Sequence, residues 1–243
     1  MPILITGAAS GIGLEFLKRW APKQICIAVD NVPIPLDWLP EGYEHSVLAY
    51  TVDLTSPTAI EKLGQKLKQV SISCIIHSAG IRGLVSSIHQ TNPTDVRSAE
   101  TMESMDAATM TTTFQINALG TFLLVKELFS SLRLALQLGD EVKVVVMSSR
   151  MGSISGNNSG GGYAYRASKA ALNAIVKSFA VDIPEMTFLM VHPGRVETGL
   201  VLAKEQGAMR AEESVSDMIA LFDRLSSKDS GRFLDRFGED IPF

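Results

Sequence analysis

The chain is poor in the residues that build disulfide frameworks and metal sites. It contains two cysteines and four scattered histidines among 243 residues, without a metal-ligand spacing. Cys26 and Cys74 each lie inside an apolar run, "QICIAVD" and "ISCIIHS". We therefore expect buried structural thiols, no metal and a reducing, cytoplasmic setting.

Positive charge and long apolar runs are also scarce. The net charge is -4 and no lysine- or arginine-rich run occurs, which argues against a nucleic-acid partner. No apolar stretch approaches the roughly 18 residues of a membrane span. The start, "MPILITGAASGIG", enters a glycine loop after six residues, so we expect neither a secretory leader nor a membrane partner.

Short apolar runs alternate with helical patterns along the whole chain. With 46% apolar and 20% charged residues and no linker, this pattern predicts one α/β domain over residues 1–243. We expect a doubly wound Rossmann fold, with about seven parallel strands and helices on both faces. Strands are expected at 3–6, 25–30, 47–53, 72–78, 142–149, 186–193 and 231–235; helices near 12–20, 57–69, 108–136, 164–181 and 212–226; and loop with short helix over 81–106.

The segment "TGAASGIG" (6–13) follows the first expected strand and opens a helix. In that context Gly7 permits a sharp turn, Gly11 lets backbone approach a phosphate, and Gly13 allows close helix–strand contact. The helix N-terminus offers free N–H groups to a pyrophosphate. A simple tight turn is the alternative; dinucleotide binding is the favoured interpretation.

Two aspartates end the next strands. Asp30 lies 17 residues after Gly13, where a carboxylate can accept hydrogen bonds from ribose hydroxyls and repel a 2′-phosphate. The flanking "VDNVP" has no Lys or Arg, so NAD is favoured over NADP as cofactor; a solvated Asp at a loop start is the alternative. Asp53 is a second candidate, placed to meet the adenine edge.

The stretch "SGGGYAYRASKAALN" (159–173) holds two tyrosines before a lysine. In a helix Tyr165 and Lys169 are four residues apart and share a face, whereas Tyr163 and Lys169 lie about 240° apart. A nearby ammonium lowers the pKa of a phenol, so Tyr165 is the expected general acid/base. Tyr163 is expected at the mouth of the cleft.

Polar residues elsewhere converge on this helix. Ser148 and Ser149 end an expected strand at the carboxyl edge of the sheet, where a serine could hold a substrate oxygen or simply make a turn. Asn117 stands amid an apolar helix, where it could satisfy its neighbours or position a water or a backbone kink beside the lysine.

Together these motifs resemble the short-chain dehydrogenase/reductase family almost from end to end. The matching residues are Thr6-Gly7-x-x-x-Gly11-Ile12-Gly13, Tyr165-x-x-x-Lys169, Ser149, Asn117, Asp53 and Pro193-Gly194 with Thr198. "SSRMGSISGNNSGGGYAYRASKAALN" and the tail "DSGRFLDRFGEDIPF" are similar to the branch with bacterial C-factor and the insect carbonyl reductase sniffer.

The resemblance implies a set of site residues. Asn117, Ser149, Tyr165 and Lys169 would be catalytic, with Asn117 supporting a proton relay through water. The implied cofactor-binding residues are Gly7, Ser10, Gly11, Ile12, Gly13, Asp30, Asp53, Leu54, Ala79, Gly80, Tyr165, Lys169, Pro193, Gly194, Val196 and Thr198.

The sequence departs from the family pattern in two places, at His77-Ser78 and at Asp30. The sequence "HSAG" (77–80) replaces the usual Asn-Asn-Ala-Gly, with His77 and Ser78 in place of both asparagines. We interpret this change as structural drift. Relatives in this branch often carry a basic residue near Asp30 and use NADP, so NADP is the alternative cofactor.

We therefore expect an NAD(P)-dependent oxidoreductase that interconverts a small-molecule secondary alcohol and a carbonyl. The alternative is a cofactor-binding signalling or regulatory protein with little turnover. Residues 198–212 are expected to form a substrate lid, a surface loop being the alternative. Family members commonly pair through the two long helices, here 108–136 and 164–181, which implies a homodimer or homotetramer.

Overall fold

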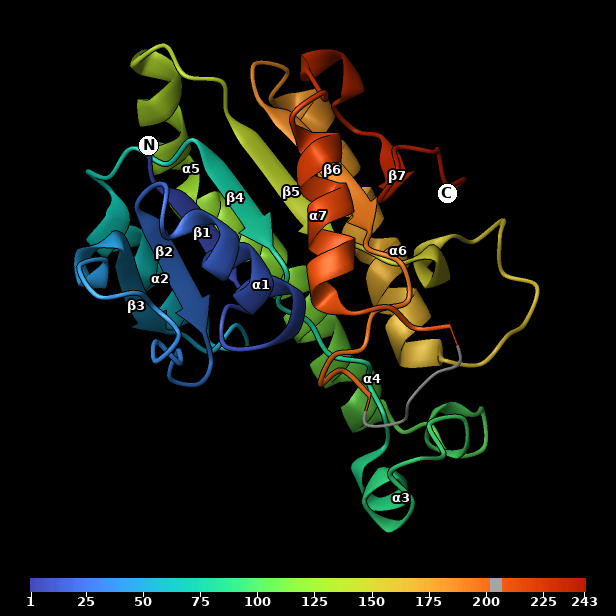
Figure 1. The fold of residues 1–243 in the computed structure, drawn as a ribbon. Coiled ribbons are helices and arrows are strands. Elements are labelled where there is room, and N and C mark those ends of the chain that lie inside the picture. Colours follow the sequence, from blue (N-terminus) through green and yellow to red (C-terminus); the bar gives the residue numbers. More distant parts are fainter. Residues whose placement is uncertain (202–206) are drawn as a thin grey trace.

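The computed structural model describes residues 1–201 and 207–243, and its centre is a sheet of seven parallel strands. The strand order is β3-β2-β1-β4-β5-β6-β7, which confirms the doubly wound parallel sheet (Figure 1). The strands are β1 Ile3–Thr6, β2 Cys26–Asp30, β3 Val47–Thr51, β4 Cys74–His77, β5 Lys143–Met147, β6 Thr187–His192 and β7 Phe233–Asp235.

Helices cover both faces of the sheet. The helices α1 and α7 pack together on one face, while α2 packs on α5, and α4 on α6, on the other (Figure 1). Their bounds are α1 Gly11–Trp20, α2 Pro57–Leu67, α3 Ser86–Thr91, α4 Ala107–Phe114, α5 Gly120–Gln137, α6 Tyr163–Asp182 and α7 Ala211–Phe222.

Side chains alternate between the two faces because successive residues of a strand point in opposite directions. Leu4, Ile75 and Val144 are neighbours in register and belong to the core beneath α2, α5 and α6. Their successors Ile5 and Ile76 belong to the core beneath α1 and α7. Burial on both faces explains why the strands read as apolar runs without alternation.

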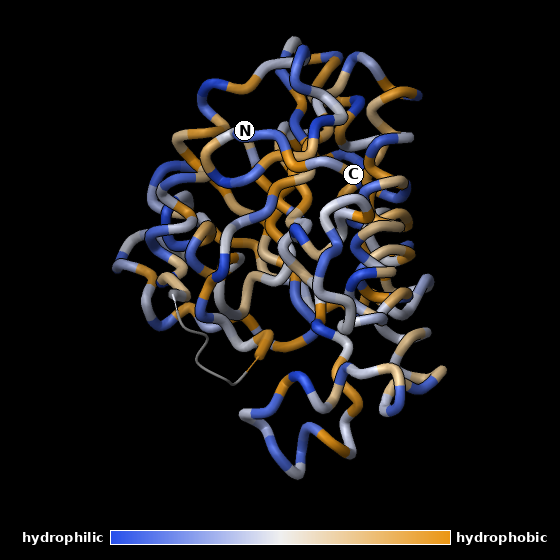
Figure 2. Tube along the Cα trace, turned by 90° about the vertical axis from the view of Figure 1, so that its right-hand side faces the viewer, coloured by the Kyte–Doolittle hydropathy of each residue, from blue (hydrophilic) through white to orange (hydrophobic). Residues whose placement is uncertain are grey.

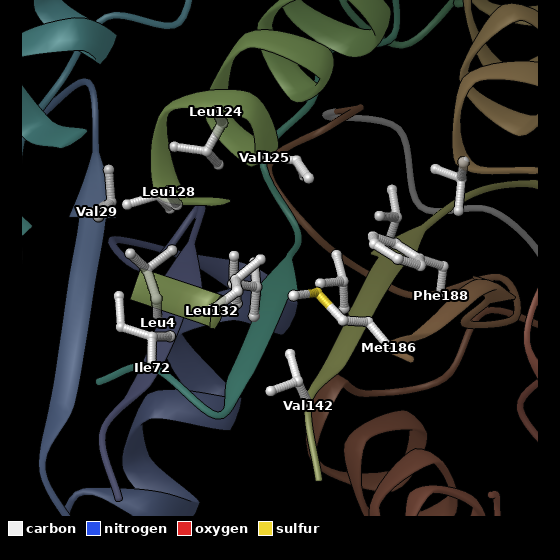
Figure 3. Close-up of a cluster of buried hydrophobic side chains, with 14 of the residues drawn as sticks. Leu4, Val29, Ile72, Leu124, Val125, Leu128, Leu132, Val142, Met186 and Phe188 are labelled. Carbon is white, nitrogen blue, oxygen red and sulfur yellow. The ribbon is translucent and has the colours of Figure 1, made fainter. Parts of the chain in front are cut away.

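The larger core lies between the sheet and α5. Figure 3 shows Leu124 and Leu128 of α5 over the strand residues Leu4 and Val29, and all four side chains are buried. Orange, hydrophobic segments run through the middle of the trace in Figure 2, and blue segments lie mostly outside. Burial of these apolar side chains is the main stabilising contribution to such a fold.

The strand order reverses at β1. After β1 the chain builds β2 and β3 on one side, then returns to place β4 on the other side of β1. Ligands of doubly wound sheets bind outside the carboxyl ends of the strands at this switch point. The glycine loop after β1 and the segment after β4 meet there, since a Cβ on Gly7 would lie 2.8 Å from the Ala79 backbone nitrogen.

The long helix expected at 108–136 is interrupted. A π-helical segment, Gln115–Leu119, separates α4 from α5 and contains Asn117. Such segments occur frequently at functional sites. The helical stretch expected near 108–136 is present as a continuous run of α4, the π-helical segment and α5, and Asn117 lies in its π-helical part.

The polar segment expected to be loop with short helix contains α3 and a 3-10 turn, Ser98–Glu100. It projects from the body of the molecule beyond α4, on the side toward which the strands β2 and β4 point (Figure 1). The segment 81–106 thus starts and ends beside the carboxyl edge of the sheet.

Candidate active site

A cavity of about 460 Å³ opens at the switch point. Its walls come from the segments that follow β1, β2, β3 and β4. It is lined by thirteen of the residues implied by the family resemblance: Gly7, Ser10, Gly11, Ile12, Asp30, Asp53, Leu54, Ala79, Gly80, Tyr165, Lys169, Pro193 and Thr198. Gly194 and Val196 line an adjoining larger cavity.

The glycines of the first loop fit a dinucleotide cradle. Gly7 and Gly11 have φ values of 66° and 52°, a region that side-chain-bearing residues rarely adopt. A Cβ on Gly13 would lie 2.1 Å from the Gly7 carbonyl oxygen, so only glycine lets α1 approach the loop so closely. The first turn of α1 holds no acidic residue, so its N–H groups are available to a phosphate.

Both aspartates are held by hydrogen bonds at the edge of this cavity. The backbone nitrogens of Ala9 and Asn31 donate to the two carboxylate oxygens of Asp30, at 2.9 and 2.8 Å. Thr55 donates to Asp53 through its backbone nitrogen and its hydroxyl, both at 2.8 Å. The Asp30 carboxylate is therefore fixed between the glycine loop and the end of β2.

His77 joins three elements beneath the cavity. Its Nδ1 lies 2.9 Å from the Thr6 hydroxyl, and its Nε2 lies 2.8 Å from the Thr121 hydroxyl. The Thr6 hydroxyl also accepts from the Ala79 nitrogen at 3.1 Å. The change to "HSAG" is therefore more than drift, because the imidazole links β1, β4 and α5.

Burial of His77, helped by the charge of Lys169, lowers its pKa to about 3. We expect the free energy of unfolding to decrease as the pH falls below about 6.5, the ordinary pKa of histidine. The unfolded chain takes up the proton first, so the stability present above pH 6.5 is lost progressively toward pH 3. The slope from this group is up to about 1.4 kcal/mol per pH unit.

Denaturant unfolding between pH 7 and pH 5 measures this slope. His192, whose pKa burial lowers to about 4, contributes in the same direction. A His77→Asn variant lacks the titrating group and should show a flatter pH dependence than the wild type. Equal slopes would contradict the assignment.

Tyr165 and Lys169 lie next to each other, as the helical spacing predicts. Both side chains are buried, and the Lys169 Nζ lies 5.7 Å from the centre of the Tyr165 ring. The same Nζ donates to the Met147 carbonyl oxygen at 2.8 Å, which ties α6 to the end of β5. Ser149 and Tyr165 both line the larger of the two adjoining cavities, and the Ser149 side chain helps to lower the pKa of Tyr165.

The charges that act on Tyr165 differ from the expectation. Burial raises the pKa of Tyr165, and the charge of Arg82 and the Ser149 hydrogen bond oppose this effect. Lys169 was expected to lower the pKa of Tyr165, but the resolved cationic influence comes from Arg82. Burial lowers the pKa of Lys169 itself to about 8.

The two serines after β5 have different environments. The Ser148 hydroxyl donates to Asn173 Oδ1 at 2.6 Å and is buried against α6. The Ser149 hydroxyl accepts from the Met151 nitrogen at 3.2 Å, and Ser149 lines the larger cavity together with Tyr165. The geometry therefore places Ser149 beside the tyrosine hydroxyl.

Asn117 is fully buried in the π-helical segment. Its Oδ1 accepts from the Ile81 nitrogen, and its Nδ2 donates to the Ile81 carbonyl, both at 2.8 Å. Its Nδ2 also donates to the Ser168 hydroxyl at 3.0 Å. The side chain thus joins the segment after β4 to α6.

A larger cavity of about 1180 Å³ adjoins the first beside Tyr165 and Ser149. Tyr163 is 43% exposed and lines it, in agreement with a place at the cleft mouth. Of the apolar residues in the expected lid, Leu200, Val201 and Met209 line this cavity. Residues 202–206, within the expected lid 198–212, lie outside the described part of the chain.

Sequence reasoning missed two charged residues of the site. Arg82 donates through two nitrogens to Glu100, at 2.8 and 2.9 Å, and its guanidinium lies over the Tyr165 ring. Arg82 lines both cavities. Its position two residues after Gly80 was the available signal, but its partner is 18 residues away in a segment without periodicity.

A family model described as short chain dehydrogenase matches residues 2–208. The chain belongs to the short chain dehydrogenase family. The glycine loop, the Tyr165–Lys169 pair and Ser149 lie around the two adjoining cavities.

Two characterised relatives are similar over much of their length. The C-signal protein of Myxococcus xanthus is 34% identical over 71% of this chain and 93% of its own. The 1-hydroxy-2-glutathionyl-2-methyl-3-butene dehydrogenase of Rhodococcus sp. (strain AD45) is 31% identical over 75% of this chain and 74% of its own.

Solved carbonyl reductases share the fold. The NADPH-bound carbonyl reductase from chicken fatty liver superposes with a TM-score of 0.84 at 25% identity, covering 100% of this chain and 98% of that one. Sniffer of D. melanogaster gives 0.82 at 23% identity, covering 100% and 99%. The expected resemblance to the C-factor and sniffer branch is confirmed.

Other sequence expectations concern thiols and membranes. Cys26 and Cys74 are free, Cys26 is buried, and burial raises the pKa of both thiols to about 12. Within residues 1–201 and 207–243, helices lack the length and apolar character needed to span a membrane.

Proposed function

We propose that this protein is an NAD(P)-dependent oxidoreductase that interconverts a secondary alcohol and a carbonyl. The observation that carries the proposal is the position of Tyr165, which lines both cavities with Lys169 beside its ring and Ser149 in the wall of the larger cavity. The smaller cavity has the glycine cradle of a dinucleotide site. The larger cavity, with its apolar rim, suits an organic substrate.

The chain's own residues supply proton transfer and orientation. A bound nicotinamide dinucleotide would supply the hydride donor or acceptor. Ser149 would hold the substrate oxygen, and Tyr165 would donate its hydroxyl proton to that oxygen during reduction or take it back during oxidation. Lys169 would hold the nicotinamide ribose and bear a positive charge next to the phenol.

Asn117 supports the site from behind the lysine. A Cβ on Gly80 would lie 3.1 Å from Asn117 Oδ1 and 3.5 Å from the Lys169 Nζ, so these groups crowd the cofactor-facing backbone. Because the amide is bonded to Ile81 and Ser168, its contribution is to fix the π-helical segment. A proton relay through water near Asn117 is part of the proposal.

We propose NAD as the preferred cofactor. Asp30 lines the cavity and would meet the ribose hydroxyls, where its charge repels a 2′-phosphate. Among the described residues lining this cavity, the basic ones are Arg82 and Lys169, both beside the Tyr165 ring. The NADPH bound to the chicken carbonyl reductase argues for the alternative.

Fluorescence titration with NADH and NADPH, followed by a panel of carbonyls and alcohols, tests the function and the cofactor together. We expect NADH to bind at least about tenfold more tightly, a difference of about 1.4 kcal/mol. Asp30→Ser should reduce that preference. Tighter NADPH binding by the wild type would overturn the argument from Asp30. Absence of turnover across the panel would count against the proposed enzymatic function.

A signalling role with little turnover is the second candidate, because one relative carries the name C-signal.

Pairing of two copies is also part of the proposal. Phe114, Leu119 and Phe122 expose apolar side chains along α4, the π-helical segment and α5, and light scattering would measure the mass of the assembly.

A further inference from the structure

A buried ion pair lies against the proposed catalytic tyrosine. The Arg82 Nε and one terminal nitrogen each donate to one carboxylate oxygen of Glu100, at 2.8 and 2.9 Å. The exposed fractions of the two side chains are 16% and 12%. Two parallel charge-assisted bonds fix the guanidinium in position as well as binding it.

The guanidinium fixed in this way lies over the ring of Tyr165, 4.9 Å from its centre. Lys169 is the other cation near this ring, with its Nζ at 5.7 Å. Glu100 reaches Arg82 from the 3-10 turn, and Ser149 follows β5 and lines the larger cavity with Tyr165. The Lys169 Nζ is bonded to the Met147 carbonyl. Of the two cations, Arg82 is the closer to the centre of the Tyr165 ring.

Glu100 also anchors the helix that carries Tyr165. Its carbonyl oxygen accepts from the Gly162 nitrogen at 3.0 Å, directly before α6 begins. Gly162 has a φ of 59°, and a Cβ there would lie 2.6 Å from Met151 Cε. The segment between Arg82 and Glu100 is therefore attached to the start of α6 at two points. The Glu100 carbonyl binds the Gly162 nitrogen, and the Arg82 guanidinium lies over the Tyr165 ring.

We propose that Arg82 is a positioning residue for the reaction, whose cation, held by Glu100, favours the phenolate form of Tyr165. The inference rests on the proposed function, because it assigns Arg82 a role through the acid/base tyrosine. A cation over a ring face is attracted to it, and more strongly when the ring carries a negative charge.

The physical need for a second cation follows from burial. Burial in low dielectric disfavours the phenolate, and raises the pKa of Tyr165 away from the range where it exchanges protons efficiently. Arg82 opposes that effect without itself titrating, because a guanidinium stays protonated throughout the working pH range. Its charge therefore contributes equally at all pH values at which the enzyme is folded.

Titration of the tyrosine by ultraviolet phenolate absorbance tests the proposal without requiring turnover. Each protein is compared with its own Tyr165→Phe counterpart, so that the difference isolates Tyr165. We expect Arg82→Met to raise the pKa of Tyr165 by about one unit or more, equivalent to a tenfold lower phenolate fraction. Arg82→Lys, which keeps the charge, should recover most of that shift.

Two further variants separate charge from structure. The double variant Arg82→Gln/Glu100→Gln keeps hydrogen-bonding groups without leaving a buried carboxylate unpaired, and should also raise the pKa. Arg133→Met removes a guanidinium 5.4 Å from the Phe129 ring on α5, so it matches the change in charge and should not shift the Tyr165 titration. Circular dichroism marks the pH range over which each variant is folded.

The outcomes are decisive in both directions. Titrations of Arg82→Met and of the double variant that coincide with the wild type would overturn the proposal, as would an Arg82→Lys protein that behaves like Arg82→Met. A shift of the phenolate titration in a protein without turnover would support the electrostatic role and count against the proposed reaction. If the protein shows turnover, the apparent pKa in the pH profile of alcohol oxidation should rise by the same amount.

Discussion

Replacing Tyr165 with phenylalanine is expected to lower kcat by about 10²–10⁴-fold, the usual contribution of a general acid or base. The substitution removes one hydroxyl from a buried side chain and leaves the ring, with Arg82 and Lys169 beside it, in place. The Ser149 hydroxyl keeps its bond to the Met151 nitrogen. Dinucleotide affinity, measured by fluorescence, should therefore change little.

Tyr163→Phe is the matched control, because it removes a hydroxyl from a tyrosine two residues away. Tyr163 is 43% exposed and about 240° around the helix from Lys169, so its loss of kcat should stay below about tenfold. Equal losses from the two variants would contradict the assignment. If a biological activity survives Tyr165→Phe unchanged while the cofactor binds, the signalling role accounts for that activity.

Gly13→Ala is the second change with a large expected effect. The new Cβ would lie 2.1 Å from the Gly7 carbonyl oxygen and 2.9 Å from the Thr6 carbonyl oxygen. Both obstacles are backbone atoms, so either the glycine loop or α1 must move. We expect the free energy of unfolding to fall by about 3 kcal/mol or more, and dinucleotide affinity to fall with it.

Gly139→Ala provides the comparison for this prediction. Gly139 has a φ of 91° and no atom within 4 Å of an added Cβ, so the cost is confined to backbone strain of about 1–2 kcal/mol. Denaturant unfolding and NADH titration of both variants measure the difference. A Gly13→Ala protein as stable as Gly139→Ala, with undiminished cofactor affinity, would refute the close-contact argument.

Much of the fold was predictable because local chemistry and the global arrangement agree. All seven expected strands are present. The strands other than the edge strand β3 are largely buried, and a strand covered on both faces is recognisable because it is apolar throughout. The helix beginning at Pro57 was marked by the Ser56 cap, whose hydroxyl accepts from the Ala59 nitrogen. The π-helical segment Gln115–Leu119 was not predictable as such, because the side chain of Asn117 within it is held by hydrogen bonds to Ile81, a residue remote in the chain.

Parts of the site that depend on local spacing were also predictable. The glycine positions follow from a strand–loop–helix context, and the Tyr165–Lys169 proximity follows from helical periodicity. The family resemblance placed the serine at Ser149, whereas the residue pattern alone left Ser148 and Ser149 open. The structure separates the two, because adjacent residues of an extended segment face opposite sides. Ser148 faces Asn173 on α6, whereas Ser149 faces the tyrosine.

The sequence by itself determined the succession of strands and helices, the cradle and the pair Tyr165–Lys169, because each depends on residues close together in the chain. Only the tertiary structure decided which charges surround that pair. Arg82 reaches the ring from the end of β4 and is held by Glu100, 18 residues further on, while the Lys169 Nζ bonds the Met147 carbonyl. Side-chain electrostatics act through space, and distances between residues remote in the chain are set by the packing of the sheet and helices.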